Sequence, residues 1–393
     1  MLKKIFGSNA RLAALAAFFI NGAVMATWVS RIPAVQGRLG LSEGGLGMVL
    51  AGMSVGVLVA LSLTGGLIAR FGSGKITLIG ALVMCASLPL LALMPNAVML
   101  WIALFLFGAM MSMMDIAMNE QAVLVERAAG KPLMSSFHAA YSVGGLAGAL
   151  IGSGMASIPG VTTLLHFLII MAFFGAAMAA AYRYLLPSEP SVEKEKQPVF
   201  SLPERALWGL GLIAFCSATS EGAVSNWSAV YLTQVLGTTA SLAALGFAAF
   251  SMTMTVGRMV GDALRKRFAP VAIVRMGGLL AGLGLLAVVL APSPAVAMVG
   301  FGLTGLGLAN VVPMAFSAAG NIPGISSGAG IAGVATIGYA GFLAGPPIIG
   351  LVAENTSLRV ALILLTVLSA SMMFSSKAIS QQDKMVVMEG AAD

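Results

Sequence analysis

The sequence predicts an all-α membrane protein with twelve transmembrane helices, arranged as two similar six-helix bundles. Three observations support this fold class. The 393 residues are 59% hydrophobic and only 9% charged, with a mean hydropathy of +0.98, whereas soluble domains carry about 25% charged residues. Long apolar runs recur along the whole chain, and the second half repeats features of the first.

The apolar runs are each about 20 residues long, which is the length that a helix needs to cross about 30 Å of hydrocarbon. They are not strands of a barrel, which would be shorter and would alternate polar with apolar residues. Backbone groups in lipid must be satisfied internally, so we expect helices. Their approximate limits are 10–32, 45–69, 75–94, 98–120, 133–156, 162–184, 206–231, 241–263, 271–291, 295–318, 328–352 and 357–378.

The distribution of Lys and Arg predicts the topology. With the amino terminus in the cytoplasm, the 21 Lys and Arg residues fall on cytoplasmic segments, except for Arg31, Arg38, Arg258 and Arg359. This bias favours both termini in the cytoplasm and an even number of spans in a cell inner membrane. The net charge of +7 is therefore a topology signal, and nucleic acid is not expected as a partner because no basic patch is interleaved with aromatic residues.

One polar stretch divides the chain into two halves. Residues 187–204 mix Glu and Lys with several prolines and are predicted to form a cytoplasmic linker. It separates an N-terminal six-helix bundle, 1–186, from a C-terminal six-helix bundle, 205–393. Two short segments of the first half recur in the second half: Asn21–Val24 as Glu221–Val224, and Leu146–Gly148 as Leu343–Gly345. The number of residues between a segment and its counterpart is nearly the same for both pairs, which indicates a duplication.

The loop between the second and third runs reads Gly66-Leu-Ile-Ala-Arg70-Phe-Gly-Ser-Gly-Lys75. It resembles the corresponding loop of major facilitator transporters, with Ala69 at that family's acidic position. The resemblance implies alternating access between two halves and a cytoplasmic gating contact that involves Arg70 and Lys75. In the second half, Arg258 and Asp262 lie one turn apart and are expected to pair in an equivalent contact.

Within that superfamily the chain is most similar to the bacterial fucose-permease-like branch. The resemblance rests on Asp115 in the fourth run, the Phe137-His138-x-x-Tyr141-Ser142 segment and Glu221-Gly222. In that branch acids in the first and fourth spans are associated with sugar–proton symport. The first span here has Asn21, which does not titrate.

Asp115, His138 and Glu221 are the predicted proton-coupling residues. Ionisable groups inside a membrane segment mark functional sites by default. Burial favours the neutral form of a carboxylic acid, and an imidazole exchanges protons near neutral pH. Asp115 and His138 are expected at similar depth and as neighbours; the alternative is a structural hydrogen-bonded pair that joins two helices.

Polar and aromatic side chains near the middle of the spans are the predicted substrate ligands, because substrates of such transporters bind there. Trp28 and Trp227 either stack on a flat ring or form an interfacial belt, and Arg31 either clamps an anion, pairs with Glu221 or snorkels to the interface. Packing between helices is the favoured role of Asn310 and Tyr339, and His166 is expected at the interface. The full set is Asn21, Trp28, Arg31, Asn119, Tyr141, Asn226, Trp227, Asn310 and Tyr339.

The predicted function is proton-coupled uptake of a small polar solute, such as a sugar or an organic acid, by alternating access. The alternatives are proton-coupled efflux of an amphipathic drug-like compound and a non-transporting membrane receptor. No Walker-type loop or catalytic arrangement occurs, so the chain is not expected to be an enzyme. Neither cofactor nor metal is expected, and the predicted partners are the solute, protons and lipid, with the protein as a monomer.

Overall fold

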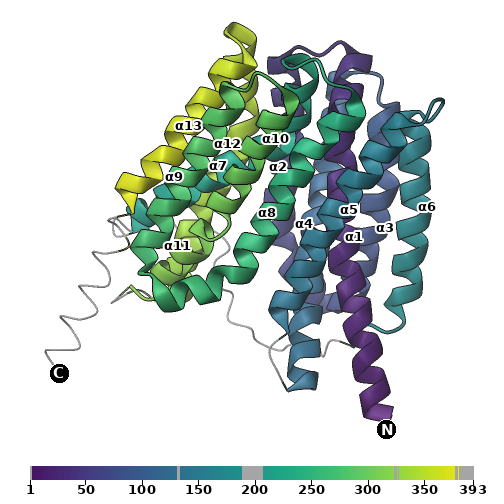
Figure 1. Cartoon of the computed structure of the whole chain (residues 1–393). Coiled ribbons are helices and arrows are strands. Elements are labelled where there is room, and N and C mark those ends of the chain that lie inside the picture. Colours follow the sequence, from purple (N-terminus) through teal and green to yellow (C-terminus); the bar gives the residue numbers. More distant parts are fainter. Residues whose placement is uncertain are drawn as a thin grey trace, which may run out of the picture. The chain divides into compact units, whose positions relative to one another are not determined.

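A computed structural model describes residues 2–130, 133–187, 207–322, 325, 327–376 and 379. Within these ranges the chain is helical and contains no strand. The helices are α1 (Leu2–Leu39), α2 (Glu43–Phe71), α3 (Ser73–Leu93), α4 (Ala97–Ala129), α5 (Met134–Ser157), α6 (Thr163–Tyr182), α7 (Trp208–Gln234), α8 (Ala240–Arg267), α9 (Pro270–Val289), α10 (Pro294–Leu308), α11 (Val311–Ala319), α12 (Ser327–Asn355) and α13 (Leu358–Ser375) (Figure 1).

The predicted spans correspond to these helices, with α10 and α11 sharing one span. Eleven spans in the described part of the chain are long and apolar enough to cross a membrane, and Pro294–Ala319 counts as one of them. α7 is of similar length but is not among the eleven; it carries Glu221 and a series of Ser, Thr and Asn residues. The helix limits predicted from hydropathy were too short, because helices such as α1 and α4 continue beyond their apolar runs.

The chain divides into two compact units, Met1–Glu193 with Gly237–Ala248, and Lys194–Leu236 with Ala249–Asp393. The predicted linker, except for Pro187, lies outside the described residues, and the bundle limits 1–186 and 205–393 remain predictions. In the first unit α1 packs against α5, α4 and α6, while α4 packs against α2 and α3 (Figure 1). In the second unit α7 packs against α12, α13 and α11, and α9 packs against α10 and α13.

Glycines allow the closest helix contacts in both units. A Cβ atom at Gly144 of α5 would collide with the carbonyl oxygen of Phe19 in α1. In the second unit a Cβ atom at Gly341 of α12 would collide with the carbonyl oxygen of Phe215 in α7. Small residues let membrane helices approach closely, so the α1–α5 and α7–α12 pairs are held together by the same kind of contact.

These contacts do not decide the register of the repeat. A Cβ atom at Gly341 would meet Thr219 as closely as Phe215, so the alignment of Asn21 with Glu221 remains a prediction.

Candidate functional site

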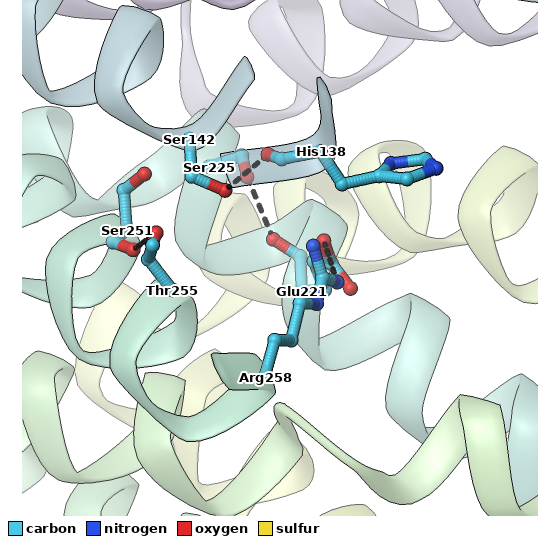
Figure 2. Close-up of polar contacts among 7 residues, drawn as sticks. All are labelled: His138, Ser142, Glu221, Ser225, Ser251, Thr255 and Arg258. Carbon is cyan, nitrogen blue, oxygen red and sulfur yellow. Dashed lines mark hydrogen bonds and ion pairs between the residues drawn. The ribbon is translucent and has the colours of Figure 1, made fainter. Parts of the chain in front are cut away.

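The clearest charged arrangement lies between α7 and α8 in the second unit. Oε1 of Glu221 is 3.6 Å from Nη2 of Arg258, and Figure 2 shows the two side chains pointing toward each other. The side chains are 34% and 42% exposed, respectively. The site is therefore an accessible ion pair between two helices.

Small and polar neighbours shape the α7 side of this site. Ser225 Oγ donates to the carbonyl of Glu221 at 2.9 Å, and Asn226 Nδ2 donates to the carbonyl of Gly222 at 2.8 Å. Both are bonds to the preceding turn of the same helix, a common arrangement for such side chains. Gly222 itself lies against the Phe342 ring of α12, so one face of α7 is packed while the adjacent carboxylate stays accessible.

Arg258 therefore pairs with Glu221, whereas the sequence predicted Asp262 or, for Glu221, Arg31. The Asp262 side chain lies outside the described part of the structure, so its gating role remains a prediction. Arg70 and Lys75 both lie over the Phe71 ring, at 5.1 and 5.5 Å from its centroid. Their gating role also remains a prediction.

Asp115 and Asn119 form the polar face of α4 in the first unit. Asn119 Nδ2 donates to the Asp115 carbonyl at 2.8 Å and lies 3.4 Å from Asp115 Oδ1. The predicted shared face is therefore confirmed. The side chains of Asp115 and His138 are not covered by other residues of the protein, and their role in proton coupling remains a prediction.

α1 lies between the helices that carry these two residues. Asn21 Nδ2 donates to the carbonyl of Met111, one turn before Asp115 on α4, at 3.2 Å. On the α5 side, the Phe18 ring contacts His138 edge-on, with 5.4 Å between the ring centroids. α4 and α5 each pack extensively on α1 and contact each other much less, because α1 occupies the space between them. Direct proton sharing between Asp115 and His138 remains a prediction.

The two candidate tryptophans are core residues in this structure. Trp28 and Trp227 are both fully buried, so the interfacial-belt alternative was wrong. Their indole Nε1 atoms have no hydrogen-bond partner among the described residues. Each therefore presents a buried donor inside its own unit, and their role in substrate binding remains a prediction.

Asn310 has the packing role that the sequence favoured. It lies at the break between α10 and α11, is buried, and donates from Nδ2 to the Gly257 carbonyl of α8 at 2.9 Å. Tyr141 and Tyr339 are partly buried on α5 and α12. Asn226 is buried, and within the described part of the chain its Oδ1 has no hydrogen-bond partner.

The expectation for His166 was wrong, and Arg31 does not snorkel. His166 is fully buried, and its Nδ1 accepts a hydrogen bond from Arg31 Nε at 3.0 Å. Arg31 is 5% exposed. The two residues belong to α1 and α6 and are far apart in the sequence. The sequence showed only that His166 lies near the start of an apolar run, which does not indicate a contact with Arg31.

Sequence reasoning also missed two polar residues near the end of α4. Gln121 is fully buried; its Nε2 donates to Ser73 Oγ and to the Leu186 carbonyl, and its Oε1 accepts from the Leu186 N–H, each at 2.8 Å. The Glu126 carboxylate accepts from the N–H groups of Leu133 and Met134 and so caps α5. The predicted span ended at residue 120, which placed both residues in a solvated loop.

Comparison with known proteins establishes the family. The Major Facilitator Superfamily model matches residues 12–321 and 210–379. The chain is 36% identical to an uncharacterised MFS-type transporter of Yersinia pestis, over 95% of this chain and 97% of that protein. It is 33% identical to membrane protein MosC of Rhizobium meliloti, over 88% of this chain and 84% of that protein. The chain therefore belongs to the Major Facilitator Superfamily.

Solved structures share its fold. The nucleoside transporter NupG gives a TM-score of 0.77 at 12% identity, covering 94% of this chain and 99% of that chain. A bacterial homologue of the human lysosomal transporter Spinster gives a TM-score of 0.75 at 14% identity, covering 94% of this chain and 96% of that chain. The Escherichia coli fucose:proton symporter FucP gives a TM-score of 0.62 at 16% identity, covering 94% of this chain and 98% of that chain. These similarities confirm the predicted fold class, and the fucose permease is among the structures that share it.

Proposed function

We propose that this protein is a secondary active transporter of the inner membrane that takes up a small polar solute, such as a sugar or an organic acid, together with protons. Both termini face the cytoplasm, and the solute crosses by alternating access. The Glu221–Arg258 ion pair carries this proposal, because it joins two membrane-embedded helices and contains a carboxylate with a single counter-charge beside it.

The proposed coupling follows from the charge of the pair. With Glu221 ionised, the opposite charges stabilise each other and hold α7 to α8. A proton on Glu221 removes this attraction and leaves Arg258 as an uncompensated cation, which is unfavourable in a membrane segment. The arrangement with α7 held to α8 is then favoured when Glu221 is ionised, and a second arrangement is favoured when Glu221 carries the proton. A proton-coupled transporter requires such a dependence of its conformation on proton binding.

The exposed Asp115 on α4 is proposed as a second proton-binding group. Asn119 donates one long hydrogen bond to this carboxylate, so protonation does not break a tight local network. Asn21, which bonds to the preceding turn of α4, is proposed to help fix the face of α4 on which Asp115 lies.

The experiment uses the purified full-length protein in proteoliposomes with an alkaline interior. Sugars and organic acids are first screened by thermal shift, since a ligand that binds the folded state raises its melting temperature. A labelled hit should accumulate inside the vesicles above its external concentration, and a protonophore should abolish the accumulation. Accumulation driven by the opposite gradient would instead indicate efflux, and binding without flux would indicate a receptor.

A further inference from the structure

Arg31 and His166 form a buried pair in the first unit, and the positive charge of Arg31 has no anionic partner among the described residues. Arg31 is 5% exposed and His166 is fully buried, so water competes little for either side chain. Arg31 Nε donates to His166 Nδ1. Because Nδ1 accepts this bond, the imidazole is neutral and carries its hydrogen on Nε2.

Three buried donors in the first unit lack acceptors among the residues that the structure describes. They are Nη2 of Arg31, Nε2 of His166 and Nε1 of Trp28. Trp28 lies three residues before Arg31 on α1, so the two side chains leave the helix on the same side. Buried polar atoms are normally hydrogen-bonded, and a group of donors without acceptors points to a missing ligand that supplies acceptors.

The positive charge of Arg31 is also unpaired. Among the residues that the structure describes, Arg31 forms no ion pair, although buried charges in membrane segments are normally compensated. His166 lies in the first turn of α6, where the helix dipole adds partial positive charge. A buried water would satisfy a donor but would leave this charge uncompensated, so the missing ligand is an anion.

We infer that the Arg31–His166 pair binds the carboxylate group of a small monoanionic solute. Arg31 supplies a single positive charge and the imidazole is neutral, so a monoanion balances the site, whereas a phosphate dianion would leave excess negative charge. A carboxylate oxygen can accept a charge-assisted hydrogen bond from Nη2 of Arg31, which lacks an acceptor among the described residues. Close packing favours a small group, since a Cβ atom at Gly152 of α5 would collide with Ser30 and would lie 3.9 Å from His166 Cε1.

α1 contains a feature that permits access to this enclosed site. Pro33 lies inside the helix, two residues after Arg31. Proline lacks an N–H group, so the carbonyl of Val29 has no donor from the next turn, and helices bend most readily at such positions. Bending of α1 at Pro33 would uncover Arg31 without unfolding the helix. That the bound carboxylate belongs to the transported solute rests on the proposed function.

Binding is tested on the full-length protein in detergent, with acetate, lactate and benzoate as probes at constant ionic strength. The matched neutral probes are acetamide, lactamide and benzamide, and chloride is the control anion. We expect the carboxylates, but not the amides or chloride, to raise the melting temperature and to give saturable heat in titration calorimetry. An equal response to chloride or to the amides would overturn the assignment to a carboxylate.

The variant Arg31→Gln should weaken carboxylate binding on the order of 10- to 100-fold, as expected for loss of a charge-assisted hydrogen bond. His166→Gln should weaken it less. Arg38→Gln removes an exposed arginine from the same helix and should bind as the wild type does. Without ligand, Arg31→Gln should be at least as stable as the wild type, because an uncompensated buried charge is removed; if it does not fold, Arg31→Lys replaces it. Wild-type affinity in both the Arg31 and the His166 variants would refute the site.

Transport assays separate this inference from the proposed function. If carboxylates bind in an Arg31-dependent manner but no solute enters wild-type vesicles, the binding site stands and the transport proposal fails. If wild-type vesicles accumulate a neutral solute and carboxylates neither bind nor compete, transport stands and the carboxylate site fails.

Discussion

Glu221 of α7 and Arg258 of α8 face each other with 3.6 Å between Oε1 and Nη2. The pair is only partly exposed, and it joins two helices. Because the ion pair lies between two helices and is accessible, substitution of its acid provides a direct test of proton coupling.

The variant Glu221→Gln should lose gradient-driven accumulation, because glutamine is close in shape to the protonated acid but cannot release a proton. Accumulation in proteoliposomes should fall to the level measured without a pH gradient. Exchange of labelled for unlabelled solute should persist, since it needs no net proton movement. Glu354→Gln, which changes an exposed acid in α12, is the control and should accumulate solute normally. Gradient-driven accumulation by Glu221→Gln would exclude Glu221 as a coupling group.

Asp115→Asn should also abolish the response to the pH gradient while leaving the protein folded. The side chain is exposed and its bond to Asn119 is long, so we expect the free energy of unfolding to change by less than about 0.5 kcal/mol. Uptake and melting temperature are measured on the same preparation. Glu43→Gln, at a half-buried acid in the first turn of α2, serves as the control. Normal gradient-driven uptake in Asp115→Asn would remove Asp115 from the mechanism.

Gly144→Ala should destabilise the first unit by about 1–3 kcal/mol, the usual range for an overpacked contact. Its Cβ atom would collide with the Phe19 carbonyl oxygen of α1, and neither backbone can move freely. Gly154→Ala in the same helix is the matched control, because no atom lies within 4 Å of its Cβ position; it should be neutral or stabilising by up to about 1 kcal/mol. Equal melting temperatures for the two variants would contradict the close α1–α5 contact.

Gln121→Leu should destabilise the protein by about 2–4 kcal/mol, because it leaves both backbone groups of Leu186 without their side-chain partner. Ser73→Ala should cost less, since it removes one of the three bonds of Gln121. Chemical unfolding of the single and double variants gives the coupling between these residues. Because the two share a hydrogen bond, their effects should not add; strict additivity would show that the bond contributes nothing.

The topology is tested by cysteine labelling. The two native cysteines, Cys85 and Cys216, are both buried and should give a low background. Ser157 and Arg183 are exposed. Ser157 is the last residue of α5 and Arg183 follows α6, so the predicted topology places them on opposite sides of the membrane. A membrane-impermeant maleimide should label Ser157→Cys in intact cells and Arg183→Cys only after permeabilisation. The reverse pattern would place the amino terminus outside.

Much of the fold was predictable from residue types along the chain. The long apolar runs predicted the helices because a membrane helix satisfies its own backbone hydrogen bonds, so its existence depends on local sequence. The limits were less predictable: α1 continues through Pro33 to Leu39 and α4 continues to Ala129, since a helix does not have to end where the hydrocarbon layer ends.

The candidate site was predictable only in part. The spacing of Asp115 and Asn119 fixed their common face, because helical periodicity is a local property. The partners of Arg31 and Glu221 were not predictable in this way, and neither was the burial of Trp28 and His166. Those outcomes depend on how each helix is rotated about its axis and on which helix lies beside it.

The sequence by itself therefore determined the helices, their membrane character and the residues available for binding and proton transfer. Only the tertiary structure decided that Glu221 meets Arg258 and that Arg31 meets His166. The physical reason is that backbone hydrogen bonds in these helices are local, whereas a side-chain ion pair or hydrogen bond between helices depends on packing contacts distributed over a whole unit.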